Sequence, residues 1–145
     1  MTIMADRPTI FIPRQGVVKT SRGSQFVKTI TSTDHKRIGH LYLATSFIWF
    51  LVGGILALML RAELARPGLQ FMSTEQYNQV FTMHGTIMVF FLFTAVLTGA
   101  FGNFLIPLQI GARDMAFPVL NMLSYWIYLL SCIVLVAAFF VEGGA

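Results

Sequence analysis

Three long stretches of the chain carry no charged residue, and they constrain the fold more than any other feature. They lie at 41–60, 76–112 and 115–141, and contain 20, 37 and 27 residues. Twenty residues of α-helix rise about 30 Å, which matches the hydrocarbon thickness of a bilayer. Because backbone polar groups in lipid must be hydrogen-bonded within the protein, these stretches predict membrane-spanning helices.

The composition excludes the main alternatives. Only 11% of the residues are charged, against about 25% in a soluble domain, so a soluble domain and a disordered polar tail are both excluded. The single cysteine, Cys132, excludes a disulfide framework within this chain. We therefore expect an all-α, integral membrane helical bundle, with spans at about 39–61, 76–108 and 115–141 that run up, down and up. The second span is expected to end near Pro107.

The basic residues are concentrated at one end of the chain. Residues 1–40 hold seven Lys and Arg against two acids, whereas residues 41–145 hold three against four. An excess of Lys and Arg beside a span marks the cytoplasmic side. We expect residues 1–32 to form a cytoplasmic basic arm and residues 33–145 to form the first three transmembrane helices of a protein of the inner (plasma) membrane. Nucleic acid is not an expected partner, because the charge is not spread over a binding face.

One histidine lies inside a span. His84 is about two turns into the second predicted helix, among aromatic and methionine side chains. Ionisable groups at that depth are costly and are usually functional or partnered. A neutral imidazole in a dry pocket suits haem iron, and Gly85 leaves room for a flat ring; a structural histidine bonded to another helix is the alternative. His35 and His40 lie at the opposite membrane surface, so they cannot share an iron with His84.

Three polar residues meet at the predicted inner surface. Asp114 begins the third span, and Asn121 follows two turns later on the same face. Asn103 lies near the end of the second span, on the same side of the membrane. An acid at an aqueous entrance with amides leading inward is what proton uptake needs. Structural alternatives remain open: Asp114 pairs with Arg113 or caps the third helix, and Asn103 links two helices.

The outer ends of the first two spans carry further candidates. Arg61 either contacts a cofactor edge or extends to the surface. Glu63 either joins Gly68 in a peripheral cation site or forms a salt bridge with Arg66. Tyr77 is either an aromatic anchor at the interface or a cofactor contact.

These positions belong to short motifs that occur in a particular order. The motifs are Thr33-Asp34-His35-Lys36 with Ile38-Gly39 and Leu41-Tyr42, Arg61-Ala62-Glu63-Leu64, Thr82-x-His84-Gly85 with Phe90-Phe91, Gly102-Asn103 with Ile106-Pro107-Leu108 and Gly111-Ala112, and Asp114-Met115-Ala116-Phe117-Pro118 with Asn121. They resemble the opening of subunit I of the haem–copper respiratory oxidases. The likeness covers about residues 31–142.

The resemblance implies a function. Subunit I of that family is a bundle of about twelve transmembrane helices that holds a low-spin haem and a binuclear haem–copper centre, reduces dioxygen to water and pumps protons. The resemblance implies that His84 is an axial ligand of the low-spin haem, that Arg61 contacts the formyl group of that haem and that Tyr77 lies near it. It also implies roles for the polar residues near the membrane surfaces: a proton-channel entrance at Asp114, a channel lining at Asn103 and Asn121, and a peripheral cation site at Glu63 and Gly68.

The resemblance also implies what this chain lacks. A second Asn often follows the one that matches Asn121, and here that place is Met122. The second axial histidine and the ligands of the copper and the second haem belong to later helices, so this segment alone is expected to be inactive. The expected partners are the remaining helices of subunit I, subunits II and III, membrane lipid, and cytochrome c or quinol as electron donor.

The alternatives are a quinol oxidase or a nitric oxide reductase of the same superfamily, or a small helical membrane protein that is not an enzyme. The Arg61-Ala62-Glu63-Leu64 segment favours a cytochrome c oxidase, because the acid is commonly absent from quinol oxidases.

Overall fold

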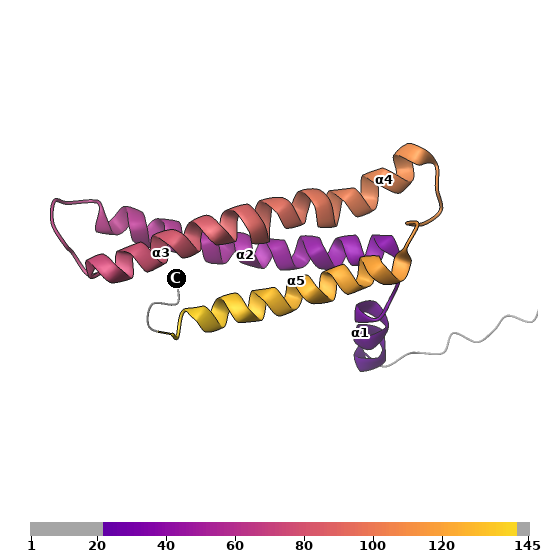
Figure 1. Cartoon of the computed structure of the whole chain (residues 1–145), viewed down its shortest axis with the longest axis horizontal. Coiled ribbons are helices and arrows are strands. Elements are labelled where there is room, and N and C mark those ends of the chain that lie inside the picture. Colours follow the sequence, from indigo (N-terminus) through magenta and orange to yellow (C-terminus); the bar gives the residue numbers. More distant parts are fainter. Residues whose placement is uncertain (1–21, 142–145) are drawn as a thin grey trace, which may run out of the picture.

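The computed structural model describes residues 22–141, and within that range the regular structure is entirely helical. Three helical rods lie side by side, and each runs opposite to the one before it (Figure 1). The second rod is one long helix whose central part is wound differently from its ends. The elements are α1 (Arg22–Ile30), α2 (His35–Glu63), α3 (Thr74–Thr86), η1 (Ile87–Phe101), α4 (Gly102–Ile110) and α5 (Pro118–Ala138).

All three rods are long and apolar enough to cross a membrane, which confirms the predicted bundle of three spans. The first two rods, His35–Glu63 and Thr74–Ile110, extend a few residues beyond the predicted spans at both ends. The third begins at Pro118, because proline has a fixed φ and no N–H and is therefore favoured in the first turn of a helix. Most apolar side chains of the three rods face outward, toward lipid or further protein.

Local signals in the sequence explain where the rods begin and end. The side chain of Asp34 accepts a hydrogen bond from the Lys36 N–H at 3.0 Å and caps α2. Ser73 and Gln76 form a reciprocal capping box at the start of α3. The second rod continues past Pro107, where we expected it to stop. It ends at Gly111, whose φ of +68° suits glycine, and the Ala112 N–H bonds back to the Pro107 carbonyl.

The middle of the second rod, η1, is a π-helix of 15 residues. The Thr94 hydroxyl donates to the carbonyl of Val89, five residues earlier, at 2.9 Å. π-helical turns are rare and usually short, and they often occur near functional sites. Here the π-helix begins three residues after His84 and is the main packing partner of α2.

The core consists of two apolar clusters. One surrounds Tyr42 and Tyr125 near the start of α2, and the other surrounds Trp49 and Phe91 farther along the bundle. A small residue is required where η1 crosses α2, because a Cβ at Gly99 would lie 2.5 Å from the Tyr42 ring. This close approach places the polar residues of α2, η1 and α4 within reach of one another.

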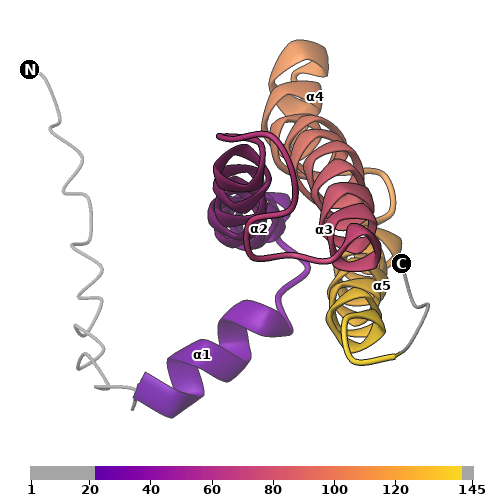
Figure 2. The same ribbon diagram turned by 90° about the vertical axis from the view of Figure 1, so that its left-hand side faces the viewer.

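The part of the predicted basic arm that the structure describes is helical. α1 lies across the end of the bundle instead of along it (Figures 1 and 2). Phe26 and Val27 of α1 are exposed, which is typical of a helix that rests on a membrane surface. The remainder of the arm, residues 1–21, lies outside the described residues.

Candidate functional site

His84 is held by the main chain of the neighbouring rod. Its Nδ1 lies 2.9 Å from the carbonyl oxygen of Gly53 on α2. A carbonyl only accepts hydrogen bonds, so Nδ1 carries the proton and donates it. Nε2 is then the unprotonated nitrogen, and it has no hydrogen-bond partner among residues 22–141.

The bond between His84 and Gly53 depends on close packing. A Cβ at Gly53 would lie 2.7 Å from the sulfur of Met88 and 3.3 Å from Ile87. Because Gly53 lacks that atom, the two rods approach closely enough for its carbonyl to reach the imidazole. Met83 and Ile87, on either side of His84 along the helix, are buried and keep this contact dry.

The donor set fits a haem iron. Histidines that ligate metals usually donate their second N–H to a carbonyl or carboxylate, which fixes the tautomer and the ring orientation. Gly85 is exposed, and nothing lies within 4 Å of the position of a Cβ there, so the helix surface beside His84 is open. The described residues contain no group of three or more His, Cys, Asp or Glu that suits a bare metal ion.

The other candidates around His84 lie nearer the end of the bundle that contains the α2–α3 turn. Tyr77 is half-buried, seven residues before His84 on α3. Arg61 is exposed in the last turn of α2, eight residues after Gly53, which is about 12 Å along the helix. Neither side chain forms a hydrogen bond or an ion pair with His84 within the described part of the chain.

Glu63 ends α2 and organises the turn that follows. It is buried, and its two carboxylate oxygens accept backbone N–H groups from Gln70 at 2.6 Å, Phe71 at 3.0 Å and Met72 at 3.2 Å. The structure shows no salt bridge from Glu63 to Arg66 among the described residues. Gly68, within the same turn, has a φ of +87°.

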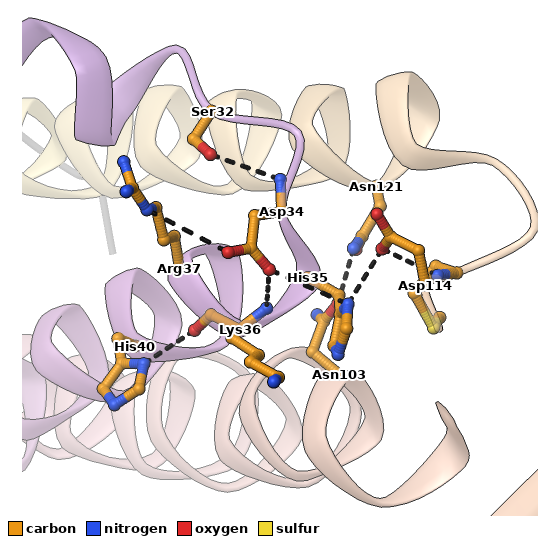
Figure 3. A network of polar contacts seen from close by, with 10 residues as sticks. Ser32, Asp34, His35, Lys36, Arg37, His40, Asn103, Asp114 and Asn121 are labelled. Carbon is orange, nitrogen blue, oxygen red and sulfur yellow. Dashed lines mark hydrogen bonds and ion pairs between the residues drawn. The ribbon is translucent and has the colours of Figure 1, made fainter. Parts of the chain in front are cut away.

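At the opposite end of the bundle, Asp114 pairs with His35 (Figure 3). The His35 Nδ1 lies 2.8 Å from the Asp114 Oδ1, which also accepts the Met115 N–H at 2.8 Å. These two hydrogen bonds stabilise the carboxylate and hold the pKa of Asp114 below its usual value. His35 is buried, whereas the Asp114 side chain is 45% exposed.

This pairing differs from both structural alternatives for Asp114. Among the described residues Asp114 forms no ion pair with Arg113. α5 has no side-chain cap, because Phe117 occupies the N-cap position. The sequence placed His35 at this membrane surface but did not predict its contact with Asp114. The chain offers no local signal for the contact, because 79 residues separate the two.

Asn103 and Asn121 lie directly behind this pair (Figure 3). Asn103 is buried; its Nδ2 donates to the Gly99 carbonyl, and its Oδ1 accepts from the Asn121 Nδ2. The bond between the two amides links α4 to α5. The predicted trio of Asp114, Asn103 and Asn121 is therefore brought together at one end of the bundle.

Polar contacts continue inward from these amides. The Ser124 hydroxyl donates to the Asn121 carbonyl at 2.6 Å and lies 2.9 Å from the Tyr42 hydroxyl. Thr45, one turn beyond Tyr42 on α2, lies 3.0 Å from the hydroxyl of Tyr125. Tyr42 and Ser124 were not predicted as site residues. Ser124 follows Asn121 by three residues and therefore shares its helix face, whereas Tyr42 lies in an apolar core cluster and offers no such signal.

The two sites lie far apart within one bundle. His35 and Gly53 are 18 residues apart on α2, which is about 27 Å along a continuous helix. Together they define a class: a helical membrane protein with a partly buried histidine hydrogen-bonded to a neighbouring helix toward one surface and a partly exposed acid–histidine pair at the other.

Comparison with known proteins specifies the family. A family model described as Cytochrome C and Quinol oxidase polypeptide I matches residues 37–145. The chain is 59% identical over 123 residues to a Streptomyces coelicolor protein named for cytochrome c oxidase subunit 1-beta, with 85% of this chain and 21% of that protein covered. It is 48% identical over 151 positions to cytochrome c oxidase subunit 1 of Corynebacterium diphtheriae, with 100% of this chain and 26% of that protein covered.

This chain belongs to the cytochrome c and quinol oxidase polypeptide I family. It spans about a fifth to a quarter of the length of the curated relatives that it matches.

Proposed function

We propose that this chain forms the opening helices of the catalytic subunit of a terminal respiratory oxidase, which reduces dioxygen to water and pumps protons. Family membership supports this proposal, and relatives named as cytochrome c oxidase subunit 1 favour cytochrome c as the electron donor. The copper, the second haem and their ligands then belong to the remaining helices of subunit I. Subunits II and III are the proposed protein partners.

The observation that carries the proposal is the hydrogen bond from His84 to Gly53. It leaves Nε2 free to bind iron as one axial ligand of a low-spin haem. Such a haem supplies one-electron transfer. The chain itself contributes the oriented imidazole, the dry surroundings of Met83 and Ile87, and the open surface beside Gly85.

Arg61 and Tyr77 are the proposed contacts for the edge of the haem. Arg61 has no ion-pair partner among the described residues, so its guanidinium is available to a carbonyl or anionic substituent. Tyr77 lies on the same helix as His84, two turns nearer the membrane surface. We also assign Glu63 and Gly68 to a peripheral cation site. In this structure the Glu63 carboxylate accepts three backbone N–H groups.

At the other end, Asp114 is the proposed entrance for protons. Its exposed carboxylate faces water, and its partner His35 is buried against the bundle. Asn103, Asn121, Ser124 and Tyr42 then form a connected set of polar groups that leads inward. Such a set positions water molecules that conduct protons without a charged group inside the span.

The excess of Lys and Arg near the start of α2 supports a cytoplasmic location for the Asp114 end. Protons then enter from the cytoplasm of a bacterial cell, across its plasma membrane. His84 lies nearer the outer surface.

The test uses the full-length, assembled enzyme with two substitutions at His84. H84A removes the ring, whereas H84Q keeps a side-chain donor for the Gly53 carbonyl but lacks the ligating nitrogen. We expect both variants to lose the low-spin haem band in the visible spectrum. We also expect their rate of oxygen consumption to fall about 100-fold or more. A normal band in H84Q would show that His84 serves only to join the helices.

The identity of the electron donor is tested with the full-length wild-type enzyme. Oxygen consumption with reduced cytochrome c is expected, and a response to quinol alone would place the protein among the quinol oxidases. Reduction of nitric oxide without reduction of dioxygen would place it among the nitric oxide reductases.

A further inference from the structure

A basic pocket lies beside the Asp114 end of the bundle. His35, the partner of Asp114, forms part of its lining, but none of the roles above uses its two cationic side chains, Lys36 and Arg113. It occupies about 380 Å³ between the first turns of α2 and the last turn of α4. Lys36, His40 and Arg113 supply its basic side, and Phe104, Pro107 and Leu108 supply an apolar wall.

The two permanent cations of this pocket are unpaired. Lys36 and Arg113 are exposed, and neither forms an ion pair within residues 22–141. The acids at this end have other partners: Asp34 caps α2 and lies 4.0 Å from Arg37, and Asp114 pairs with His35. The pocket therefore contains two cations that have no ion-pair partner among the described residues.

The apolar wall extends from this positive charge toward the membrane. Leu108 is 76% exposed on α4, and Pro107 is buried behind it. The rings of His40 and Phe104 pack edge to face with centroids 5.1 Å apart, which links α2 to α4 at the floor of the pocket. Cations at the membrane surface above an apolar wall match a molecule with an anionic head and a hydrocarbon tail.

We propose that this pocket binds an anionic phospholipid of the inner leaflet. Lys36 and Arg113 contact the headgroup phosphate, and the acyl chain lies along Phe104 and Leu108. Basic pockets between transmembrane helices on the cytoplasmic side commonly bind such headgroups. A free phosphate ion would use the cations but not the apolar wall. This site does not depend on haem binding or oxygen chemistry.

The experiment uses the full-length enzyme, extracted from membranes in mild detergent, with the bound phospholipid identified by mass spectrometry. We expect the double variant K36Q/R113Q to retain less anionic lipid and, in nanodiscs, to bind it about 30-fold more weakly, since each basic residue contributes roughly 1 kcal/mol. The variant R37Q is the matched control, because Arg37 lies at the same surface but does not line the pocket. K36R/R113K keeps the charge and is expected to retain the lipid.

Three results would overturn the proposal. The first is unchanged lipid in K36Q/R113Q, and the second is equal binding of zwitterionic and anionic lipid by the wild type. The third is full displacement of the lipid by millimolar inorganic phosphate, which would make the pocket a phosphate site.

Discussion

His84 and Asp114 are titratable residues toward opposite ends of one bundle, and their hydrogen-bond partners are of different kinds. The partner of His84 is a backbone carbonyl on a helix packed so closely that a Cβ at Gly53 does not fit. The partners of Asp114 are a histidine side chain and an N–H of an exposed turn, and its carboxylate remains 45% exposed. The role of metal ligand that we propose for His84 needs a fixed tautomer and orientation, which a backbone partner in a tight interface provides. The role of proton entrance that we propose for Asp114 needs contact with water and a side chain that can move.

The largest effect that separates the two ends is expected from D114N. The amide keeps the shape of the side chain but cannot take up a proton, so turnover is expected to fall roughly 10- to 100-fold, at the low end of acid–base effects. The low-spin haem spectrum is expected to stay unchanged. Oxygen consumption and the visible spectrum of the full-length enzyme measure the two properties independently.

D34N is the matched control for this substitution. Asp34 lies at the same end, 3.8 Å from the His35 Nδ1, and asparagine is an equally good N-cap. We expect D34N to keep normal turnover. Equal losses in D34N and D114N would mean that the surface charge matters and that the entrance is not specific to Asp114.

A smaller effect is expected from G53A, which perturbs only the His84 end. The added methyl group would lie 2.7 Å from the sulfur of the flexible Met88 side chain and 3.3 Å from Ile87, so these side chains must repack, at a cost of about 1 kcal/mol, the low end for overpacking. We expect a shifted or broadened low-spin haem band and a lower thermal midpoint, with proton uptake otherwise intact. G54A is the control, because nothing lies within 4 Å of a Cβ at Gly54. An unchanged band in G53A would separate haem ligation from the contact with Gly53.

The smallest effect is expected from H35A. In the native protein the Met115 N–H and His35 hold the pKa of Asp114 below its usual value. The ionised carboxylate therefore stabilises the fold at pH values above the ordinary Asp pKa of about 3.9. This stability is lost as the pH falls through the lowered pKa of the folded protein. Removal of His35 raises the pKa of Asp114 toward its ordinary value, so this contribution to stability becomes smaller and its loss is complete at a higher pH.

Infrared titration of the Asp114 carboxyl band, assigned by its disappearance in D114N, measures this change. The loss of stability at neutral pH is expected to be about 1 kcal/mol or less, because the pair is partly exposed. H40A is the control, since the His40 Nδ1 contacts only the Lys36 carbonyl. A pKa of Asp114 that does not change in H35A would assign the lowered value to the Met115 N–H alone.

Much of the architecture was predictable from residue type and spacing. The uncharged runs predicted three antiparallel spans, because a bilayer tolerates only internally bonded helices of a fixed length. The co-location of Asp114, Asn103 and Asn121 followed from counting residues along those spans. Pro107 marked the end of the second span only approximately: it cannot donate to the Asn103 carbonyl, yet the helix continued for three more residues until Gly111 ended it with a positive φ.

Linear order and hydrophobicity were therefore sufficient for the number, the direction and the approximate length of the helices, since these depend on how each residue interacts with lipid or water. The partners of the key side chains depended on packing between distant segments. His35 meets Asp114 across 79 residues, and His84 meets the Gly53 carbonyl across 31. Both contacts arise from how closely the rods approach, which depends on the shapes of both surfaces at once.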